Sequence, residues 1–161
     1  LSALAFKRFK KYKISLTVVG EGKYKDLYAR MSEDLDIGCK IIFKNYVSNQ
    51  KELIEFYKGA DILIIPSLSE GLPRVAIEGA AASLPIIGTN VGGIPEIISK
   101  SALIKPNSDK DLVDKLVEFF ESTSLRKEHS FRNHCKAQAY SNIILKEKRN
   151  KFYKQIQKHS L

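Results

Sequence analysis

The sequence predicts an α/β fold in which helices cover both faces of a parallel sheet. Short, β-branched apolar runs recur up to residue 104, and an amphipathic helical pattern separates each run from the next. After Pro106 only the helical pattern continues. Strands that are apolar on both faces and alternate with helices are typical of parallel sheets that are buried on both sides.

The first part of the chain supplies three predicted strands. The predicted elements are a basic amphipathic helix at 1–13, a strand at 14–19, a helix at 25–35, a strand at 40–43, a helix at 50–58 and a strand at 61–65. Helical spacing of apolar residues predicts which side chains of the second and third helices face inward. These are Leu27, Tyr28, Met31 and Leu35, and then Leu53, Ile54 and Tyr57.

The second part of the chain ends in helices only. The predicted elements are a helix of small residues at 73–83, a strand at 85–88, a short helix at 94–98, a weak strand at 102–104, and helices at 109–121, about 125–139 and from Ser141, a plausible N-cap. The side chains expected to face inward from the first and last of these closing helices are Leu112, Leu116, Val117, Phe120, Ile144, Leu145, Phe152 and Ile156.

Composition limits the class of protein. With 161 residues, 43% hydrophobic and 28% charged, the chain fits one folded domain and is neither disordered nor fibrous in composition. Cys39 and Cys135 have no metal-ligand spacing and form no disulfide framework, which suits a reducing cytosol. No apolar run approaches the roughly 20 residues that span a bilayer. We therefore expect a cytoplasmic protein, peripheral to a membrane at most.

The most informative loop follows the strand predicted at 61–65. Ligands of open parallel sheets bind at the carboxyl ends of the strands. Pro73 suits the first position of a helix, so the amides of Gly71 and Leu72 can point at an anion. A carboxylate near phosphate would be repelled, so Glu70 and Glu78 are expected to accept hydrogen bonds from sugar hydroxyls. The loop therefore offers what a nucleotide-sugar needs.

Simpler interpretations remain open for the same residues. A glutamate near a helix start is more often a favourable partner of the helix dipole than a ligand contact. Glu78 taken alone would be a solvated position, although the small residues at 79–82 let the helix lie close to the sheet, which argues against a free outer face.

Other motifs are weaker. The stretch at 20–22 begins like a dinucleotide fingerprint but lacks its third glycine. Ser67 and Ser69 have no histidine nearby in the sequence, which disfavours a nucleophilic hydrolase. Three histidines share no metal-ligand spacing with one another or with the cysteines; they are His129, His134 and His159.

Two stretches carry a resemblance to a known family. They read Pro66-Ser67-x-x-Glu70-Gly71-Leu72-Pro73-Arg74-x-x-x-Glu78 and Leu84-Pro85-Ile86-Ile87-x-Thr89-x-x-Gly92-Gly93-x-x-Glu96. Together they resemble the E-x7-E signature of retaining GT-B-fold glycosyltransferases, which use nucleotide-diphosphate sugars to build surface polysaccharides and other glycans. The resemblance is dense over residues 61–98 and looser over the rest of the chain.

The resemblance implies that residues 1–161 are the C-terminal, donor-binding domain of such an enzyme. This domain is a Rossmann-like parallel sheet, half of a GT-B fold, here followed by a helical tail from about residue 108. Such an enzyme transfers the sugar with retention to a glycan or lipid-linked acceptor. The family generally needs no metal to stabilise the departing diphosphate, so no metal or other cofactor is expected.

The resemblance also implies roles for individual residues. Glu70 takes the position of the first motif glutamate, which contacts hydroxyls of the transferred sugar, and is the candidate catalytic residue. Glu78 matches the second glutamate, which holds the ribose hydroxyls. Tyr46 falls where the family contacts the nucleobase. The remaining donor-binding candidates lie in the motif loop and the glycine loops, and are Gly71, Leu72, Pro73, Arg74, Gly20, Gly92 and Gly93.

One departure from the family pattern concerns the first strand of the domain. Family members carry an N-terminal acceptor domain, a first donor-domain strand and a glycine–arginine–lysine loop before the point that matches Leu1. In a sheet of order 3-2-1-4-5-6 that strand is central, so its absence would expose unpaired backbone and apolar faces. We therefore expect Leu1 to be a cut in a longer protein, and the fragment alone to be inactive, poorly stable or self-associating.

A rival interpretation comes from the charge of the tail. The net charge is +9, and from Ser124 onward ten basic residues stand against Glu128 and Glu147 alone. Such a surface predicts a non-catalytic α/β module that binds anionic membrane or nucleic acid. The aromatic residues lie on the apolar stripe rather than among the basic residues, which favours an ordinary solvated helical face.

Overall fold

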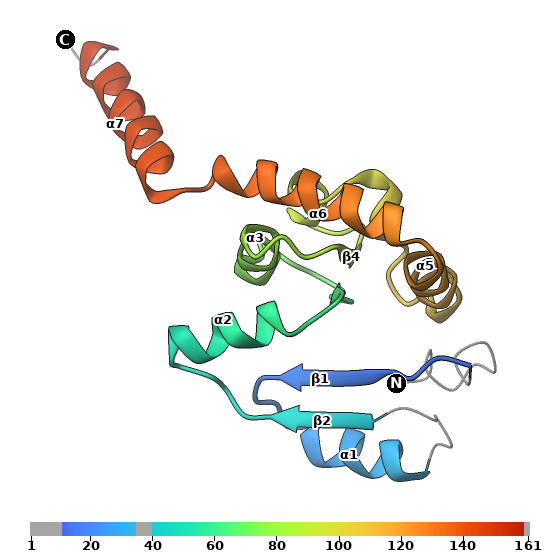
Figure 1. Ribbon diagram of the computed structural model, residues 1–161. Helices are drawn as coiled ribbons and strands as arrows, with labels where there is room; N and C mark the ends of the chain where they lie inside the picture. The colour runs from blue at the N-terminus through green and yellow to red at the C-terminus, as the bar shows by residue number, and fades with distance from the viewer. Residues whose placement is uncertain (1–10, 35–39, 160–161) are drawn as a thin grey trace.

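A computed structural model describes residues 11–34 and 40–159 of the chain and contains parallel strands in two sheets, with helices around them (Figure 1). Most of the helix predicted at 1–13 lies outside the described residues, as do Leu35 and Cys39. The elements of the first part are β1 (Ser15–Val19), α1 (Lys25–Asp34), β2 (Lys40–Lys44), α2 (Gln50–Lys58) and β3 (Leu63–Ile65). They follow the predicted order.

The second part also follows the predicted order, with small changes at the ends of its elements. It comprises α3 (Arg74–Ala81), β4 (Ile86–Thr89), α4 (Ile94–Ile97), the 3-10 helix η3 (Lys100–Ala102), β5 (Leu103–Ile104), α5 (Asp109–Glu121), α6 (Thr123–Gln138) and α7 (Asn142–His159). The weak strand predicted at 102–104 is shorter than expected, because residues 100–102 form the 3-10 helix that leads into it.

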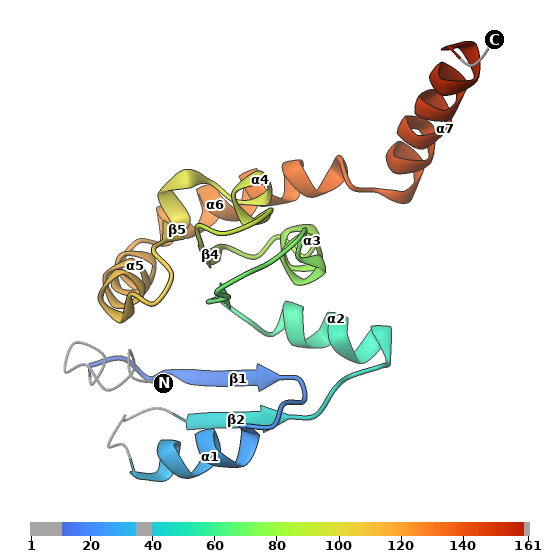
Figure 2. The same ribbon diagram turned by 180° about the vertical axis from the view of Figure 1, so that it is seen from behind.

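The strands form two separate parallel sheets. One pairs β1 with β2, from Ser15 opposite Lys40 to Val19 opposite Lys44. The other has the order β3-β4-β5. In both ribbon views β1 lies between β2 and the part of the molecule that holds the second sheet (Figures 1 and 2). This is the arrangement expected of a 3-2-1-4-5-6 sheet without its first strand.

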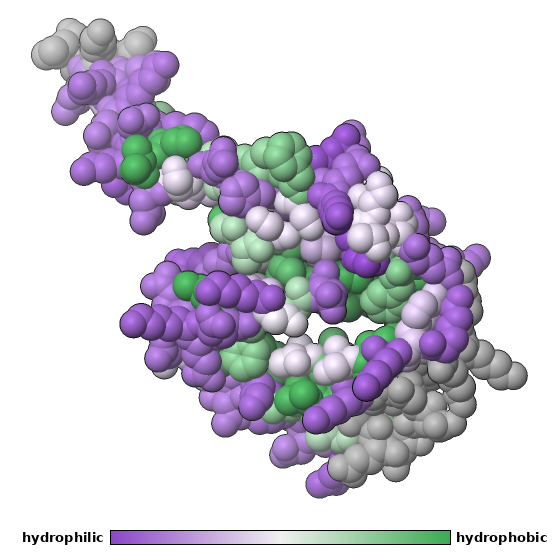
Figure 3. Space-filling model, viewed as in Figure 1, coloured by the Kyte–Doolittle hydropathy of each residue, from purple (hydrophilic) through white to green (hydrophobic). Residues whose placement is uncertain are grey.

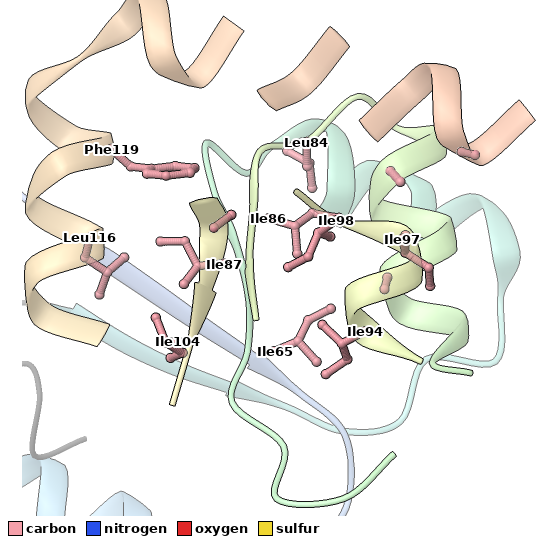
Figure 4. Close-up of a cluster of buried hydrophobic side chains, with 14 of the residues drawn as sticks. Ile65, Leu84, Ile86, Ile87, Ile94, Ile97, Ile98, Ile104, Leu116 and Phe119 are labelled. Carbon is pink, nitrogen blue, oxygen red and sulfur yellow. The ribbon is translucent and has the colours of Figure 1, made fainter. Parts of the chain in front are cut away.

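The core surrounds the second sheet. All four residues of β4 are buried, with Ile86 and Ile87 fully so, and side chains from α4, β5 and α5 pack on them (Figure 4). Small residues let α3 approach closely: a Cβ added to Gly79 would lie 2.3 Å from the side chain of Leu63. Burial of each large aliphatic side chain here stabilises the fold by roughly 1.5–3 kcal/mol.

Polar side chains fix the two helices that close this core. Ser108 caps α5, since its hydroxyl accepts a hydrogen bond from the amide of Asp111 at 3.1 Å. Ser122 caps α6 in the same way, with the amide of Leu125 at 3.1 Å. The buried Asn133 of α6 donates to the carbonyl of Leu84, just before β4, at 2.8 Å. Helical spacing predicts the helices, and these bonds place them.

Several faces predicted to point inward are exposed instead. On α1 the side chains of Leu27, Tyr28 and Met31 are exposed, and so is Ile54 of α2. α7 projects away from the rest of the described structure (Figure 1), and its exposed apolar residues are Ile143, Leu145, Phe152, Tyr153 and Ile156. In α5 the buried set is Val113, Leu116, Val117 and Phe119, while Leu112 and Phe120 are half-buried. An apolar stripe on a helix therefore predicted burial only where another element packs on that stripe.

Candidate functional site

The loop from Pro66 to Pro73 joins β3 to α3 and is held by two hydroxyl groups, one of its own and one from β4. The hydroxyl of Ser67 donates to Oε1 of Glu70 at 2.7 Å. The buried Thr89, at the end of β4, donates through Oγ1 to the carbonyl of Ser67 at 2.5 Å. The half-buried Glu70 carboxylate is therefore oriented by a side chain that β4 itself anchors. The sequence did not predict this role for Ser67.

The glycine loop after β4 packs directly on the glutamate loop. The amide of Gly93 donates to the carbonyl of Gly71 at 2.7 Å. Gly92 has φ +50°, and a Cβ there would lie 1.8 Å from the carbonyl oxygen of Glu70. Only glycine fits this position, because both the backbone conformation and the lack of space exclude a side chain. The structure thus brings together the two motifs that the sequence predicted as separate loops.

The start of α3 differs slightly from the prediction. Pro73 is buried and is the N-cap of α3, with φ −73° and ψ 118°, rather than its first helical residue. Arg74 is the first helical residue and is exposed. Gly71 and Leu72 are exposed, and among the described residues neither amide has a hydrogen-bond partner. Free amides at the start of a helix attract anions.

Glu78 lies on the exposed side of α3, which corrects the expectation that it would not be on a free outer face. Its Oε2 accepts a hydrogen bond from the hydroxyl of Tyr57, at the end of α2, at 2.9 Å. Burial raises the pKa of Tyr57 well above its usual value, and the bond to Glu78 raises it further. Helical spacing predicted that Tyr57 faces the core. Its half-buried side chain instead links α2 to Glu78, the second glutamate of the motif.

Gly20 and Tyr46 lie just after the carboxyl ends of β1 and β2, the two strands of the first sheet. The amide of Gly20 donates to the carbonyl of Lys44 at 3.1 Å and extends the β1–β2 pairing by one step. Tyr46 is 71% exposed, and the ammonium group of Lys25 bonds to the side chain of the preceding residue, Asn45. Among the described residues, no hydrogen bond or ion pair joins Gly20 or Tyr46 to the loop that carries Glu70.

A metal centre or a membrane span would each leave a recognisable pattern in the described residues. Within 11–34 and 40–159, no three or more His, Cys, Asp or Glu residues cluster as metal ligands would. Nor does this part of the chain hold a helix with the length and apolarity to cross a bilayer. His129 is buried against the ring of Phe119, with ring centroids 4.9 Å apart. It is part of the core rather than of this site.

The arrangement is suited to a polar, anionic ligand. Free amides precede α3, an oriented carboxylate lies in the loop before it, and a second carboxylate lies in the second turn of the helix. Amides and an exposed arginine can bind phosphate, and the carboxylates can accept from hydroxyl groups.

Comparison with known proteins shows which family the sequence matches. The sequence matches the family described as Glycosyl transferases group 1 over residues 1–141. TuaC of Bacillus subtilis (strain 168), a glycosyltransferase named for teichuronic acid biosynthesis, is 37% identical over 67 residues, which cover 40% of this chain and 17% of TuaC. The chain spans between 22% and 30% of the length of three further curated relatives.

Solved structures share the fold. A glycosyltransferase from Rickettsia africae ESF-5 matches with a TM-score of 0.82 at 24% identity, over 97% of this chain and 43% of that one. HepE from Anabaena, solved in complex with UDP, matches with a TM-score of 0.78 at 14% identity, over 96% of this chain and 44% of that one. In each case the match covers less than half of the solved chain.

Proposed function

The chain belongs to the glycosyl transferases group 1 family, with the fold of a GT-B C-terminal domain, and we propose that it binds the nucleotide-diphosphate sugar from which such an enzyme transfers the sugar. One observation carries this proposal: the loop of Glu70 and the glycine loop are joined by the bond from the Gly93 amide to the Gly71 carbonyl. A carboxylate and free amides are thereby held together at the carboxyl ends of β3 and β4.

Each candidate residue has a role in the proposal. Glu70 contacts hydroxyls of the transferred sugar and is the proposed catalytic residue. The amides of Gly71 and Leu72, with Arg74, bind the diphosphate and stabilise its negative charge as it departs. Glu78 accepts from the ribose hydroxyls, and its bond to Tyr57 is the one that ribose would replace or share.

The other candidates complete the proposed donor site. Tyr46 is exposed enough to stack on a nucleobase. Pro73 fixes the start of α3, and Gly92 and Gly93 support the glutamate loop. Gly20 lines the site from the first sheet. In this proposal the diphosphate is stabilised by amides and a basic side chain, so no metal ion is required.

We further propose that the whole enzyme transfers the sugar with retention to a glycan or lipid-linked acceptor in surface polysaccharide biosynthesis. The similarity to TuaC, named for teichuronic acid biosynthesis, supports this class of product. Transfer also needs an acceptor-binding part, and the matched residues of this chain cover only 22% and 30% of two of its curated relatives. The reaction would take place in the cytoplasm, at the inner face of a membrane when the acceptor is lipid-linked.

Calorimetry can test the donor site directly. We expect the chain to bind at least one of UDP, GDP and ADP, and Glu78→Gln to weaken that binding about tenfold, since a bond to a charged acceptor is lost. Glu70→Gln should leave the affinity for the free nucleotide unchanged and weaken only the corresponding nucleotide-sugar, because Glu70 contacts the sugar.

The matched control is Glu55→Gln, which alters an exposed glutamate on α2 that pairs with Lys58. It should bind every ligand as the unaltered chain does. Equal affinity of the Glu78→Gln variant and the unaltered chain for all three nucleotides would contradict the proposed role of Glu78. Equal losses for nucleotide and nucleotide-sugar in Glu70→Gln would contradict the role of Glu70.

A second candidate function, binding to an anionic membrane surface, rests on α7. This helix carries six basic residues and one acidic residue, and its exposed apolar side chains include Phe152, at 58%, and Ile156, at 46%. Basic helices with exposed apolar residues bind anionic bilayers. Sedimentation with phosphatidylserine vesicles should then show binding that falls as salt rises, and the double variant Lys151→Glu/Lys154→Glu should abolish it. Binding that is insensitive to both would contradict this second function.

A further inference from the structure

A cavity lies at the opposite ends of β3 and β4 from the candidate donor site. Its volume is about 270 Å³, and its lining includes Asp61, which precedes β3, and Leu84 and Pro85, which precede β4. The loop of Glu70 follows β3, so the length of the strands separates the two places. Side chains from α2 and from the first half of α6 complete the lining. We call this cavity the α6 pocket, and its charged and hydroxyl-bearing residues include Lys58, Asp61, Thr123, Arg126, Lys127 and Ser130.

The charge of the α6 pocket is positive. Hydrophilic residues cover much of the surface seen in Figure 3, so an exposed lysine by itself marks no site. The α6 pocket differs because cations from two separate helices line one cavity: Lys58 lies on α2, and Arg126 and Lys127 lie on α6. These three cations stand against one lining carboxylate, that of Asp61, which leaves a net charge of +2. The pocket therefore favours an anion.

Hydrogen bonds fix the guanidinium group of Arg126. Its Nη1 donates to the carbonyls of Phe119 and Phe120, the latter at 3.1 Å, and its Nη2 donates to the hydroxyl of Thr123 at 3.0 Å. A guanidinium has five N–H donors, and the described residues accept from three of them, so two remain for a ligand. A planar guanidinium that is already held in place matches the geometry of phosphate and loses little freedom when it binds.

Two other charged groups of the α6 pocket are exposed. Within residues 11–34 and 40–159, no hydrogen bond or ion pair engages the ammonium group of Lys127 or the carboxylate of Asp61. An ammonium group binds phosphate as a point charge. A carboxylate repels phosphate but accepts hydrogen bonds from hydroxyl groups. The pocket therefore offers cations for one end of a ligand and an acceptor for the other end.

We propose that the α6 pocket binds a small phosphomonoester that carries hydroxyl groups. Its phosphate accepts hydrogen bonds from Arg126 and Lys127, and one of its hydroxyls donates to Asp61. A phosphomonoester carries a charge of about −1.5 to −2 at neutral pH, which matches the +2 of the pocket. The 270 Å³ volume is just below the roughly 300–1,000 Å³ of pockets that hold drug-sized ligands. The ligand is therefore smaller than a nucleotide.

Glycerol 3-phosphate is a suitable probe for the full chain, because it joins one phosphate to two hydroxyls on three carbons. In a titration followed by amide nuclear magnetic resonance, we expect the signals of Asp61, Thr123 and Lys127 to shift along one saturation curve. Glycerol should shift none of them. Saturating UDP should leave the shifts in place, because the α6 pocket is remote from the loop of Glu70. Displacement by UDP, or shifts confined to residues 66–74, would overturn the proposal.

A pair of lysine variants tests the charge contact by calorimetry. Lys127→Gln should bind glycerol 3-phosphate about tenfold more weakly, since a charge-assisted hydrogen bond is lost. The matched control is Lys110→Gln, which removes the same charge from an exposed position near the start of α5, outside the lining of the pocket. It should bind as the unaltered chain does. Equal affinities of the two variants would overturn the proposal, because net charge alone would then explain any binding.

Asp61→Asn tests the hydroxyl end of the ligand. We expect the unaltered chain to prefer glycerol 3-phosphate to inorganic phosphate, because only the former has hydroxyls for Asp61. The substitution should reduce this preference about fivefold, since a neutral acceptor replaces a charged one. Circular dichroism establishes that each variant is folded, and all three altered side chains are exposed. An unchanged preference in Asp61→Asn would overturn the proposed orientation of the ligand and, with it, the proposal.

Discussion

The two sheets are built from similar sequences but are buried to very different extents. The strands predicted at 14–19 and 61–65 are both short and mainly aliphatic, and read Ile-Ser-Leu-Thr-Val-Val and Asp-Ile-Leu-Ile-Ile. In the first sheet and its helices no residue of 11–31 or 40–58 is buried, whereas around β3, β4 and β5 sixteen apolar side chains form the core. Hydrophobicity is therefore not what distinguishes the two regions.

The difference lies in the number of covering elements. β4 has a strand on each edge, with helices α3 to α6 packed around it, so all four of its residues lose contact with water. β1 has one neighbouring strand, and among the described strands none pairs with its second edge. Burial depends on the surroundings of a strand, so an apolar strand such as β1 stays partly exposed where no strand or helix packs against it.

The largest expected effect tests this contrast in burial. Ile86→Ala in β4 removes a fully buried side chain and should lower the free energy of unfolding by about 2–5 kcal/mol. Val18→Ala in β1 should lower it by about 1 kcal/mol or less, because Val18 is already partly in water. Urea denaturation followed by circular dichroism measures both. Equal losses would mean that the first sheet is as well covered as the second.

The next effect concerns the contact between the two motif loops. Gly92→Ala forces a side chain into the left-handed region and against the Glu70 carbonyl, so it should cost about 1–3 kcal/mol. Gly22→Ala, in the loop after β1, meets nothing within 4 Å and should change stability by at most about 0.5 kcal/mol. Thermal melting compares the two. A Gly92→Ala variant as stable as Gly22→Ala would show that the loops separate easily.

A smaller effect probes the bond between the two regions. Tyr57→Phe removes the hydroxyl that α2 donates to Glu78 of α3, and we expect a loss of about 0.5–1.5 kcal/mol. Amide hydrogen exchange should report the loss in α2 and leave β4 unchanged, because the bond is remote from the core. Faster exchange in β4 would indicate that the first region supports the second more than its burial suggests.

The last effect is absent at neutral pH and grows on acidification. Burial lowers the pKa of His129 below its usual 6.5, so the unfolded chain takes up a proton before the folded one does. The stability due to the neutral ring is therefore complete above pH 6.5 and is lost as the pH falls from there to the lowered pKa of the folded state. Chemical denaturation at a series of pH values between 7.5 and 5 measures this loss.

His134 provides the control for this pH dependence. Its ring is exposed on the same helix, 3.1 Å from the hydroxyl of Ser83. His129→Gln should flatten the decline of stability with acid, and His134→Gln should leave it as in the unaltered chain. A decline that persists unchanged in His129→Gln would place its origin elsewhere in the molecule.

The sequence predicted much of the local structure. Periodicity and capping residues gave the order of strands and helices, because these patterns depend on nearby residues. The two motifs around Glu70 and Gly92 were also visible in the sequence. Each lies in a loop that follows a predicted strand, which is where ligands of open parallel sheets bind. The inward faces of α1 and α7 were predicted wrongly, because an apolar stripe does not specify what covers it.

Contacts between distant residues were decided by the tertiary structure alone. The bond from Thr89 to the carbonyl of Ser67, the pairing of Tyr57 with Glu78 and the clash that excludes a side chain at Gly92 all depend on how separate loops and helices meet in space. No local pattern encodes such distances. The sequence by itself determined which elements form and which loops hold the candidate site residues, while the packing of helices around β3, β4 and β5 decided which strands are buried.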